Sequence, residues 1–155
     1  MKEEFSYIVD QFADLQILRY QVPGFENLSL RQKQLLYHLS EAALMGRDIL
    51  FDQNGRYNLV IRRTLEAVYQ YGTVDKSSVD YQAFEVYLKR VWFANGIHHH
   101  YGEDKFIPGF SEAFFDAAVR SVDASLLPLK VGETVDTLLA RLKPVIFDPT
   151  VMPKR

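Results

Sequence analysis

Apolar residues recur at intervals of three and four along most of this chain, and this spacing places them on one face of an α-helix. The strongest stripe begins at Phe84 and continues through Tyr87, Leu88, Val91 and Trp92. No segment alternates apolar and polar residues regularly enough to predict a strand, although some pairing near 128–131 is left open. The sequence therefore predicts an all-α fold, an irregular domain of about six helices.

Local signals indicate where the first helices begin and end. A short helix is expected at residues 5–12, where apolar residues repeat with helical spacing. Ser29 and Gln32 fit a capping box, in which the hydroxyl and the amide bind free N–H groups at a helix start. The helix that they open is expected to reach Phe51 and to carry His38 between its buried positions. Its predicted buried stripe is Leu35, Leu36, Leu39, Ala42, Ala43 and Ile49.

The later helices have clearer boundaries. Asn95 and Gly96 tolerate left-handed backbone, so they are expected to end the helix that carries the strongest stripe. Ser111 is expected to cap the next helix, and Pro144 to end the last one, because proline cannot donate a helical hydrogen bond. The inward positions predicted in these helices and the one before them are Leu59, Ile61, Leu65, Val68, Phe114, Phe115, Ala118, Val119, Val122, Val135, Leu138, Leu139 and Leu142.

Size and composition are those of an ordinary globular domain, with 155 residues, 48% of them hydrophobic and 25% charged. We expect one soluble helical domain at residues 1–146. Residues 147–155 contain two prolines and no helical pattern, so we expect them to form an exit segment that leads away from the domain.

Charge and cysteine usage exclude several classes of function. The formal charge is −2, from 18 basic and 20 acidic residues, which predicts no nucleic-acid partner and no polybasic membrane surface. The absence of cysteine excludes disulfides and thiol nucleophiles. No apolar run approaches the ~20 residues of a membrane span. Met1 leads directly into the charged residues 2–4, so no leader is expected unless one was removed, and cytoplasmic and exported locations both stay open.

Three consecutive histidines, His98, His99 and His100, are the obvious candidates for chemistry. Imidazole is a zinc ligand, but successive side chains point in different directions, so this spacing argues against a metal site. A structural loop and a ligand-facing loop remain, and the residues alone favour the first. A carboxylate close by, such as Asp104, would tune or orient a histidine, but the sequence alone favours a solvated turn here.

Known catalytic motifs are missing from the sequence. There is no H-E-x-x-H zinc helix, no glycine-rich phosphate loop and no G-x-S-x-G elbow. We therefore expect no complete catalytic apparatus in this chain.

Several segments resemble the beginning of bacterial dipeptidyl peptidase III proteins. The most specific is the run Asn-Gly-Ile-His-His-His-Tyr-Gly at 95–102, followed by Asp104, Lys105, Phe106 and Pro108. The resemblance covers most of the chain, is densest from 12 to 110, and keeps order and spacing. The other matching segments are 12–20, 37–43, 46–49, 57–63 and 87–93.

The resemblance implies a zinc metallopeptidase with two lobes, which removes dipeptides from the N-terminus of short peptides. In such proteins zinc is held by a downstream H-E-x-x-G-H helix in the other lobe, where a zinc-bound water attacks the peptide carbonyl. This chain ends at Arg155 without that motif. The resemblance therefore implies the N-terminal part of the metal-free lobe, without activity or bound zinc of its own, whose partner is the zinc-bearing lobe of the same polypeptide.

The resemblance also implies that the histidine loop faces the peptide cleft. Tyr101 is then expected to pack on bound peptide, and Lys105 to meet a backbone carbonyl or the peptide carboxylate. Asn95 and the three histidines are expected to hydrogen-bond an extended peptide or to shape the cleft. The alternative is a free-standing helical interaction module, and apolar surface left uncovered would allow the chain to dimerise. A metal-responsive loop built on the histidines is a third hypothesis.

Overall fold

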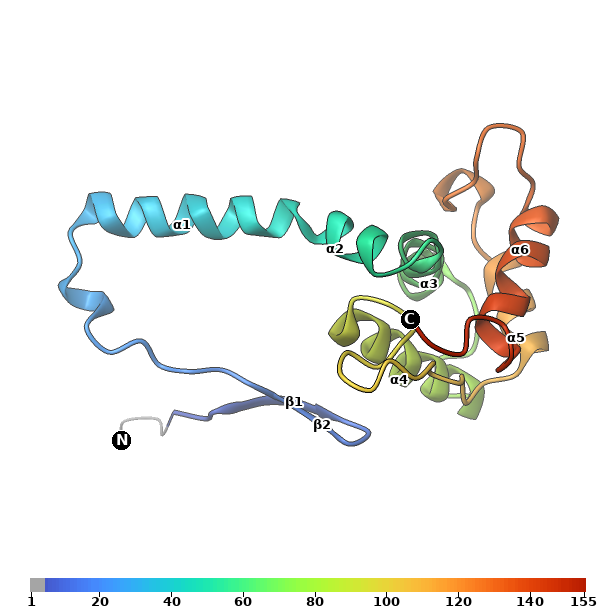
Figure 1. Cartoon of the computed structure of the whole chain (residues 1–155), viewed down its shortest axis with the longest axis horizontal. Helices are drawn as coiled ribbons and strands as arrows, with labels where there is room; N and C mark the ends of the chain where they lie inside the picture. Colours follow the sequence, from blue (N-terminus) through green and yellow to red (C-terminus); the bar gives the residue numbers. More distant parts are fainter. Residues whose placement is uncertain (1–4) are drawn as a thin grey trace. The chain divides into compact units, whose positions relative to one another are not determined.

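The computed structural model of the chain describes residues 5–155. The expectation of no leader rests on the charged residues 2–4, which lie outside the described residues. The described residues are predominantly helical, with one small sheet (Figure 1). The chain divides into two compact units, one up to Arg47 and one from Asp48 to Arg155. The elements in order are β1 (Ile8–Phe12), β2 (Leu15–Leu18), η1 (Phe25–Asn27), α1 (Leu30–Met45), α2 (Arg47–Asn54), α3 (Asn58–Tyr71), α4 (Val79–Ala94), α5 (Glu112–Arg120), η2 (Ala124–Leu126) and α6 (Val135–Phe147).

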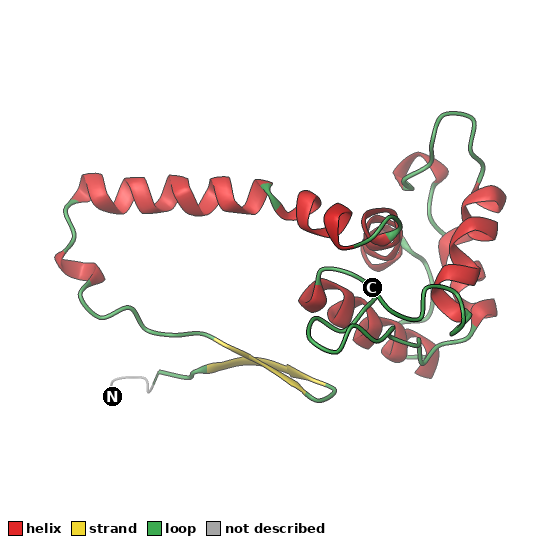
Figure 2. Cartoon of the chain, in the orientation of Figure 1, coloured by secondary structure: helices red, strands yellow, loops and turns green. Residues whose placement is uncertain are grey.

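The first unit begins with a β-hairpin, so the helix predicted at residues 5–12 is wrong. β1 and β2 pair antiparallel, with Phe12 opposite Leu15 across a two-residue turn in which Ala13 has a φ of 49°. Figure 2 shows the two strands in yellow. The segment contains Ile8 and Val9, whose β-branched side chains suit strands, and it is too short for spacing to separate helix from strand. The fold is therefore predominantly helical, and the all-α prediction holds only in that coarser form.

α1 begins as predicted but is shorter and more exposed than expected. Ser29 accepts a hydrogen bond from the N–H of Gln32, whose side chain accepts one from the N–H of Ser29, so the capping box is confirmed. The helix ends at Met45, and Gly46 separates it from α2. The predicted burial of its apolar stripe is wrong, because α1 has no buried residue and His38 is exposed too. Exposed large residues of that stripe are Leu35, Leu36, Leu39 and Ile49.

The second unit holds the core, built from α3, α4, α5 and α6. Most predicted inward positions of these helices are buried, which confirms the helical stripes there. Trp92 departs from the prediction: it is 38% exposed, and its indole N–H donates to Glu66 at 2.8 Å. The largest fully buried side chains are Phe84, Phe115, Ile61, Leu65, Leu88, Ile97, Leu138, Leu142, Ile146, Val68, Val91 and Val119.

An ion-pair group links α2 to α3 inside the second unit. Asp48 receives hydrogen bonds from Arg62 at 2.6 Å and from Arg63 at 2.5 Å. The hydrogen bond from Arg63, together with that from Arg62, lowers the pKa of the Asp48 carboxyl. Arg62 also pairs with Glu66, one helical turn further along α3, at 3.3 Å.

One prediction near the C-terminus is corrected, and one question that the sequence left open is answered. α6 continues through Pro144 to Phe147 instead of ending at the proline. The missing proline N–H frees the carbonyl of Ala140, an exposed residue, so water can replace the lost donor. The segment 128–131 is a loop, with the N–H of Leu129 donating to the carbonyl of Leu127 at 2.8 Å. None of the helices in residues 5–155 is long and apolar enough to cross a bilayer.

The division into a domain at 1–146 and an exit segment at 147–155 stays a prediction. Within the structure, residues after Phe147 belong to the second compact unit and make backbone hydrogen bonds with residues 103–105.

Burial predicts different outcomes for the same substitution at two leucines. Leu142→Ala empties space beside a side chain that is fully buried, and should lower the free energy of unfolding by about 2–5 kcal/mol. Leu39→Ala removes a side chain that is 56% exposed, and should cost less than about 1 kcal/mol. Urea unfolding followed by circular dichroism measures both. Equal losses of unfolding free energy in the two variants would contradict the exposure of Leu39 on α1.

Candidate functional site

The candidate site is the loop that follows α4, residues 95–106. α4 ends at Ala94, its cap residue Asn95 has a φ of 53°, and the N–H of Gly96 donates to the carbonyl of Val91 at 3.0 Å. The predicted cap at this pair is therefore confirmed. The carbonyl of Asn95 accepts a hydrogen bond from the side chain of Asn54 at 3.2 Å. Asn95 thus sets the direction in which the loop leaves the helix.

Asn58, at the start of α3, supports this loop and was missed by the sequence reasoning. It is 2% exposed, and its amide oxygen accepts a hydrogen bond from the N–H of Ile97 at 3.1 Å. A side chain at Gly96 would collide with the Asn58 amide, since an added Cβ would lie 2.4 Å from its nitrogen. The available signal was its position, because Asn58 lies on the same helical face as the buried Ile61 and Leu65.

His98 is a buried part of the fold. It is 4% exposed, and its Nε2 lies 2.8 Å from the carbonyl oxygen of Met152. A carbonyl accepts only, so Nε2 carries a proton. The other ring nitrogen, Nδ1, is buried with no hydrogen-bond partner in residues 5–155. His98 therefore links the loop to the C-terminal segment.

His99 closes a tight turn through both its backbone and its ring. Its N–H donates to the carbonyl of Asp104 at 2.7 Å, and its carbonyl accepts from the N–H of Glu103 at 2.9 Å. Its Nδ1 accepts from the N–H groups of Tyr101 at 3.2 Å and Gly102 at 2.9 Å. Nδ1 is thus unprotonated in this arrangement, which leaves Nε2 as the protonated nitrogen of a neutral ring.

His100 lies at the centre of an aromatic cluster, which we define as Phe93, His99, His100 and Tyr101. The His100 ring stacks on His99 with centroids 4.6 Å apart, meets the edge of Phe93 at 5.0 Å, and lies 4.3 Å from Tyr101. Tyr101 is 86% exposed and Phe93 39%, so Tyr101 is the ring that this cluster presents most fully to solvent.

Lys105 holds the end of the chain rather than pointing freely into solvent. Its ammonium donates to the carbonyls of Asp148 at 2.6 Å and Val151 at 2.9 Å. Burial lowers the pKa of Lys105, and the Asp148 carboxylate offsets part of this effect. The family resemblance implied that Lys105 meets a backbone carbonyl or the carboxylate of a bound peptide. The carbonyls that it contacts belong to this chain.

The C-terminal residues lie against the loop in extended pairing. The N–H of Lys105 donates to the carbonyl of Pro153, and the N–H of Arg155 donates to that of Glu103. An antiparallel bridge joins Asp104 to Lys154. Figure 2 shows the chain end running beside this loop. The loop is therefore fixed on one side by α3 and on the other by residues 148–155.

The three histidine rings make different contacts and do not gather around a common metal position. One ring meets the C-terminal segment, one caps its own turn, and one stacks among aromatic rings. Across residues 5–155, no group of three His, Cys, Asp or Glu side chains is placed to hold a metal ion.

A scan of protein-family models matches none to this chain, and a search of curated proteins finds no significant relative. The dipeptidyl peptidase III resemblance and the cleft-lining roles drawn from it stay predictions.

The contacts of Lys105 lead to a measurable expectation. Lys105→Met removes two hydrogen bonds from a charged donor, each worth about 1 kcal/mol or more, and loosens the chain end. The amides of Lys105 and Arg155 should then exchange with solvent at least about fivefold faster by NMR. Lys154→Met removes an exposed 3.5 Å ion pair and should change these rates by less than about twofold. Unchanged exchange in Lys105→Met would show that the ammonium does not hold the segment.

Proposed function

We propose that this chain is the N-terminal helical part of a zinc-dependent dipeptidyl peptidase of the dipeptidyl peptidase III type, and that loop 95–106 forms one wall of its peptide cleft. The single observation that carries the proposal is the placement of Tyr101, which is 86% exposed on a loop whose backbone is fixed on both sides. A rigid, exposed aromatic ring loses little conformational entropy on binding. Such a ring is suited to pack on an extended peptide.

The proposal divides the site residues between contact and support. Tyr101 contacts the peptide, and His99 and His100 hold its ring from below. His98, Lys105 and the cap at Asn95 shape the cleft wall, since their polar groups are engaged with the protein itself. This narrows the expectation for Lys105, whose ammonium serves the chain's own carbonyls and would reach a peptide carboxylate only after releasing them.

The catalytic chemistry belongs to the rest of the proposed polypeptide. Zinc held there would supply an activated water, and the residues of this chain would bind and orient the peptide. The sequence from Met1 to Arg155 has no zinc-helix motif, so we expect the isolated chain to be inactive and to bind no zinc.

A substitution pair in the full-length enzyme tests the role of Tyr101. Tyr101→Ala should raise KM for a dipeptidyl-arylamide by about threefold to tenfold with kcat unchanged, because ring packing contributes equally to the ground state and the transition state. Tyr101→Phe keeps the ring and should behave like the parent. An unchanged KM in Tyr101→Ala would remove Tyr101 from the cleft. Robust turnover by the isolated 155-residue chain with zinc would contradict the proposal that the catalytic residues lie in the rest of the polypeptide.

A second candidate function, a free-standing interaction module, is favoured by the exposed apolar face of α1. Leu35, Leu36 and Leu39, which share one side of the helix, are 58%, 42% and 56% exposed. A face of this kind fits association with another surface, including a second copy of this chain. The reading frame separates the two functions, because a stop codon after Arg155 favours the module and a downstream H-E-x-x-G-H helix favours the peptidase.

A further inference from the structure

Two adjoining cavities lie along α3 in the second unit, away from the histidine loop in sequence. The first, which we name the basic cavity, has a volume of about 270 Å³ and includes the side chains of Arg56, Arg63, Lys130 and Arg141 in its lining. Asp52 is the one acidic residue in that lining. Four cations facing one carboxylate give the cavity a positive character.

Two of these cations form ion pairs and two do not, but the Glu133 carboxylate also lies beside Lys130 and accepts a hydrogen bond from its backbone N–H at 2.9 Å. Arg141 is engaged by Glu133 in a two-point pair, with Nε at 2.8 Å and Nη2 at 2.9 Å, and Arg63 is paired with Asp48. Arg56 and Lys130 form no ion pair within residues 5–155, the part of the chain that the structure describes. The Arg56 guanidinium lies 5.5 Å from the centre of the Tyr57 ring, which restricts its motion. The surplus positive charge at this cavity is therefore carried mainly by Arg56, and Lys130 adds a charge that Glu133 partly offsets.

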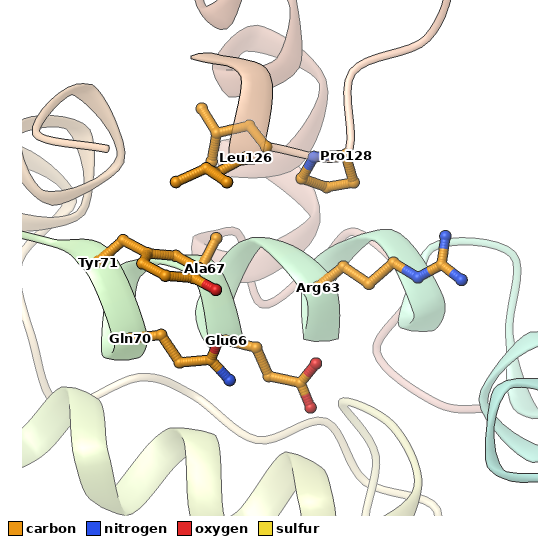
Figure 3. Close-up of a pocket in the computed structure, with 8 residues that line it drawn as sticks. Arg63, Glu66, Ala67, Gln70, Tyr71, Leu126 and Pro128 are labelled. Atoms are coloured by element: carbon orange, nitrogen blue, oxygen red, sulfur yellow. The ribbon is translucent and has the colours of Figure 1, made fainter. Parts of the chain in front are cut away.

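The second cavity, which we name the apolar cavity after Ala67, Tyr71, Leu126, Leu127 and Pro128, also has Arg63, Glu66 and Gln70 in its lining. Its volume is about 250 Å³, and it shares Arg63 and Pro128 with the basic cavity. Figure 3 shows Leu126 and Pro128 facing α3 across it, with Tyr71 at one end and Arg63 extending along the helix at the other. A charged cavity and an apolar one thus adjoin at the same arginine.

We propose that these two cavities form one binding site for a small organic anion. Its oxyanion group lies between Arg56 and Lys130 in the basic cavity, where guanidinium and ammonium groups recognise phosphate or carboxylate oxygens. Arg63 keeps N–H groups beyond the one bound to Asp48, and it lines both cavities. The apolar body of the ligand lies beside Tyr71 and Leu126. This inference uses none of the residues of the peptidase proposal, so either can fail alone.

Phenyl phosphate, titrated into the 155-residue chain and followed by amide NMR shifts, tests the site. The ligand should saturate with a Kd of about 1–10 mM, as expected for so small a molecule at an open site. Shifts should concentrate on residues 56–71 and 126–130. Phenol, which has the ring without the charge, should bind at least about tenfold more weakly.

Matched variants separate specific recognition from general attraction. Arg56→Gln and Lys130→Gln should each weaken phenyl phosphate binding at least about threefold, because each removes one unpaired exposed charge. Lys76→Gln removes an exposed charge outside both cavities and should leave Kd unchanged. Leu126→Ser should weaken phenyl phosphate but not inorganic phosphate. The proposal fails if no saturable binding occurs up to about 20 mM, or if all three cation variants change Kd equally.

Discussion

The hydrogen bond from the Ile97 N–H to the Asn58 amide oxygen ties the histidine loop to the core. Both residues are buried, and the bond joins the first turn of α3 to the first turn of the loop after α4. A buried N–H without an acceptor costs about 1–3 kcal/mol, so this contact defines where the chain runs after the α4 cap. Gly96 is required beside it, because a side chain there would overlap the asparagine.

A second set of contacts fixes the loop from its far side. The Lys105 ammonium and the His98 ring bind carbonyls of residues 148–152, and the following residues continue as an extended partner of 103–105. These bonds span 43–54 positions in the chain. The histidine loop therefore connects α3 and α4 to the C-terminal segment. Tyr101 is the most exposed member of its aromatic cluster.

The sequence predicted well what depends on neighbours in the chain. Caps at Ser29, Ser111 and Asn95 were found because their partners lie within a few residues. The α4 and α6 stripes were found because helical spacing identifies an apolar face. Burial of α1 was not predictable, since spacing says which face is apolar and not whether another part of the chain covers it. The hairpin was missed because eight residues carry too little periodicity.

The candidate site divides in the same way. The sequence identified His98, His99, His100 and Lys105, but it could not assign their partners, because those lie far along the chain or depend on backbone geometry inside the turn. Asn58 was visible only as a polar residue at an inward position.

Hydrogen exchange in Asn58→Ala tests most directly whether this one contact holds the loop. We predict that amides of residues 97–106 exchange about tenfold faster or more, while those of α5 and α6 keep their protection. Asn54→Ala, which loses a less buried bond to the Asn95 carbonyl, should have a smaller effect on the same amides. Unchanged protection of residues 97–106 in Asn58→Ala would contradict the account.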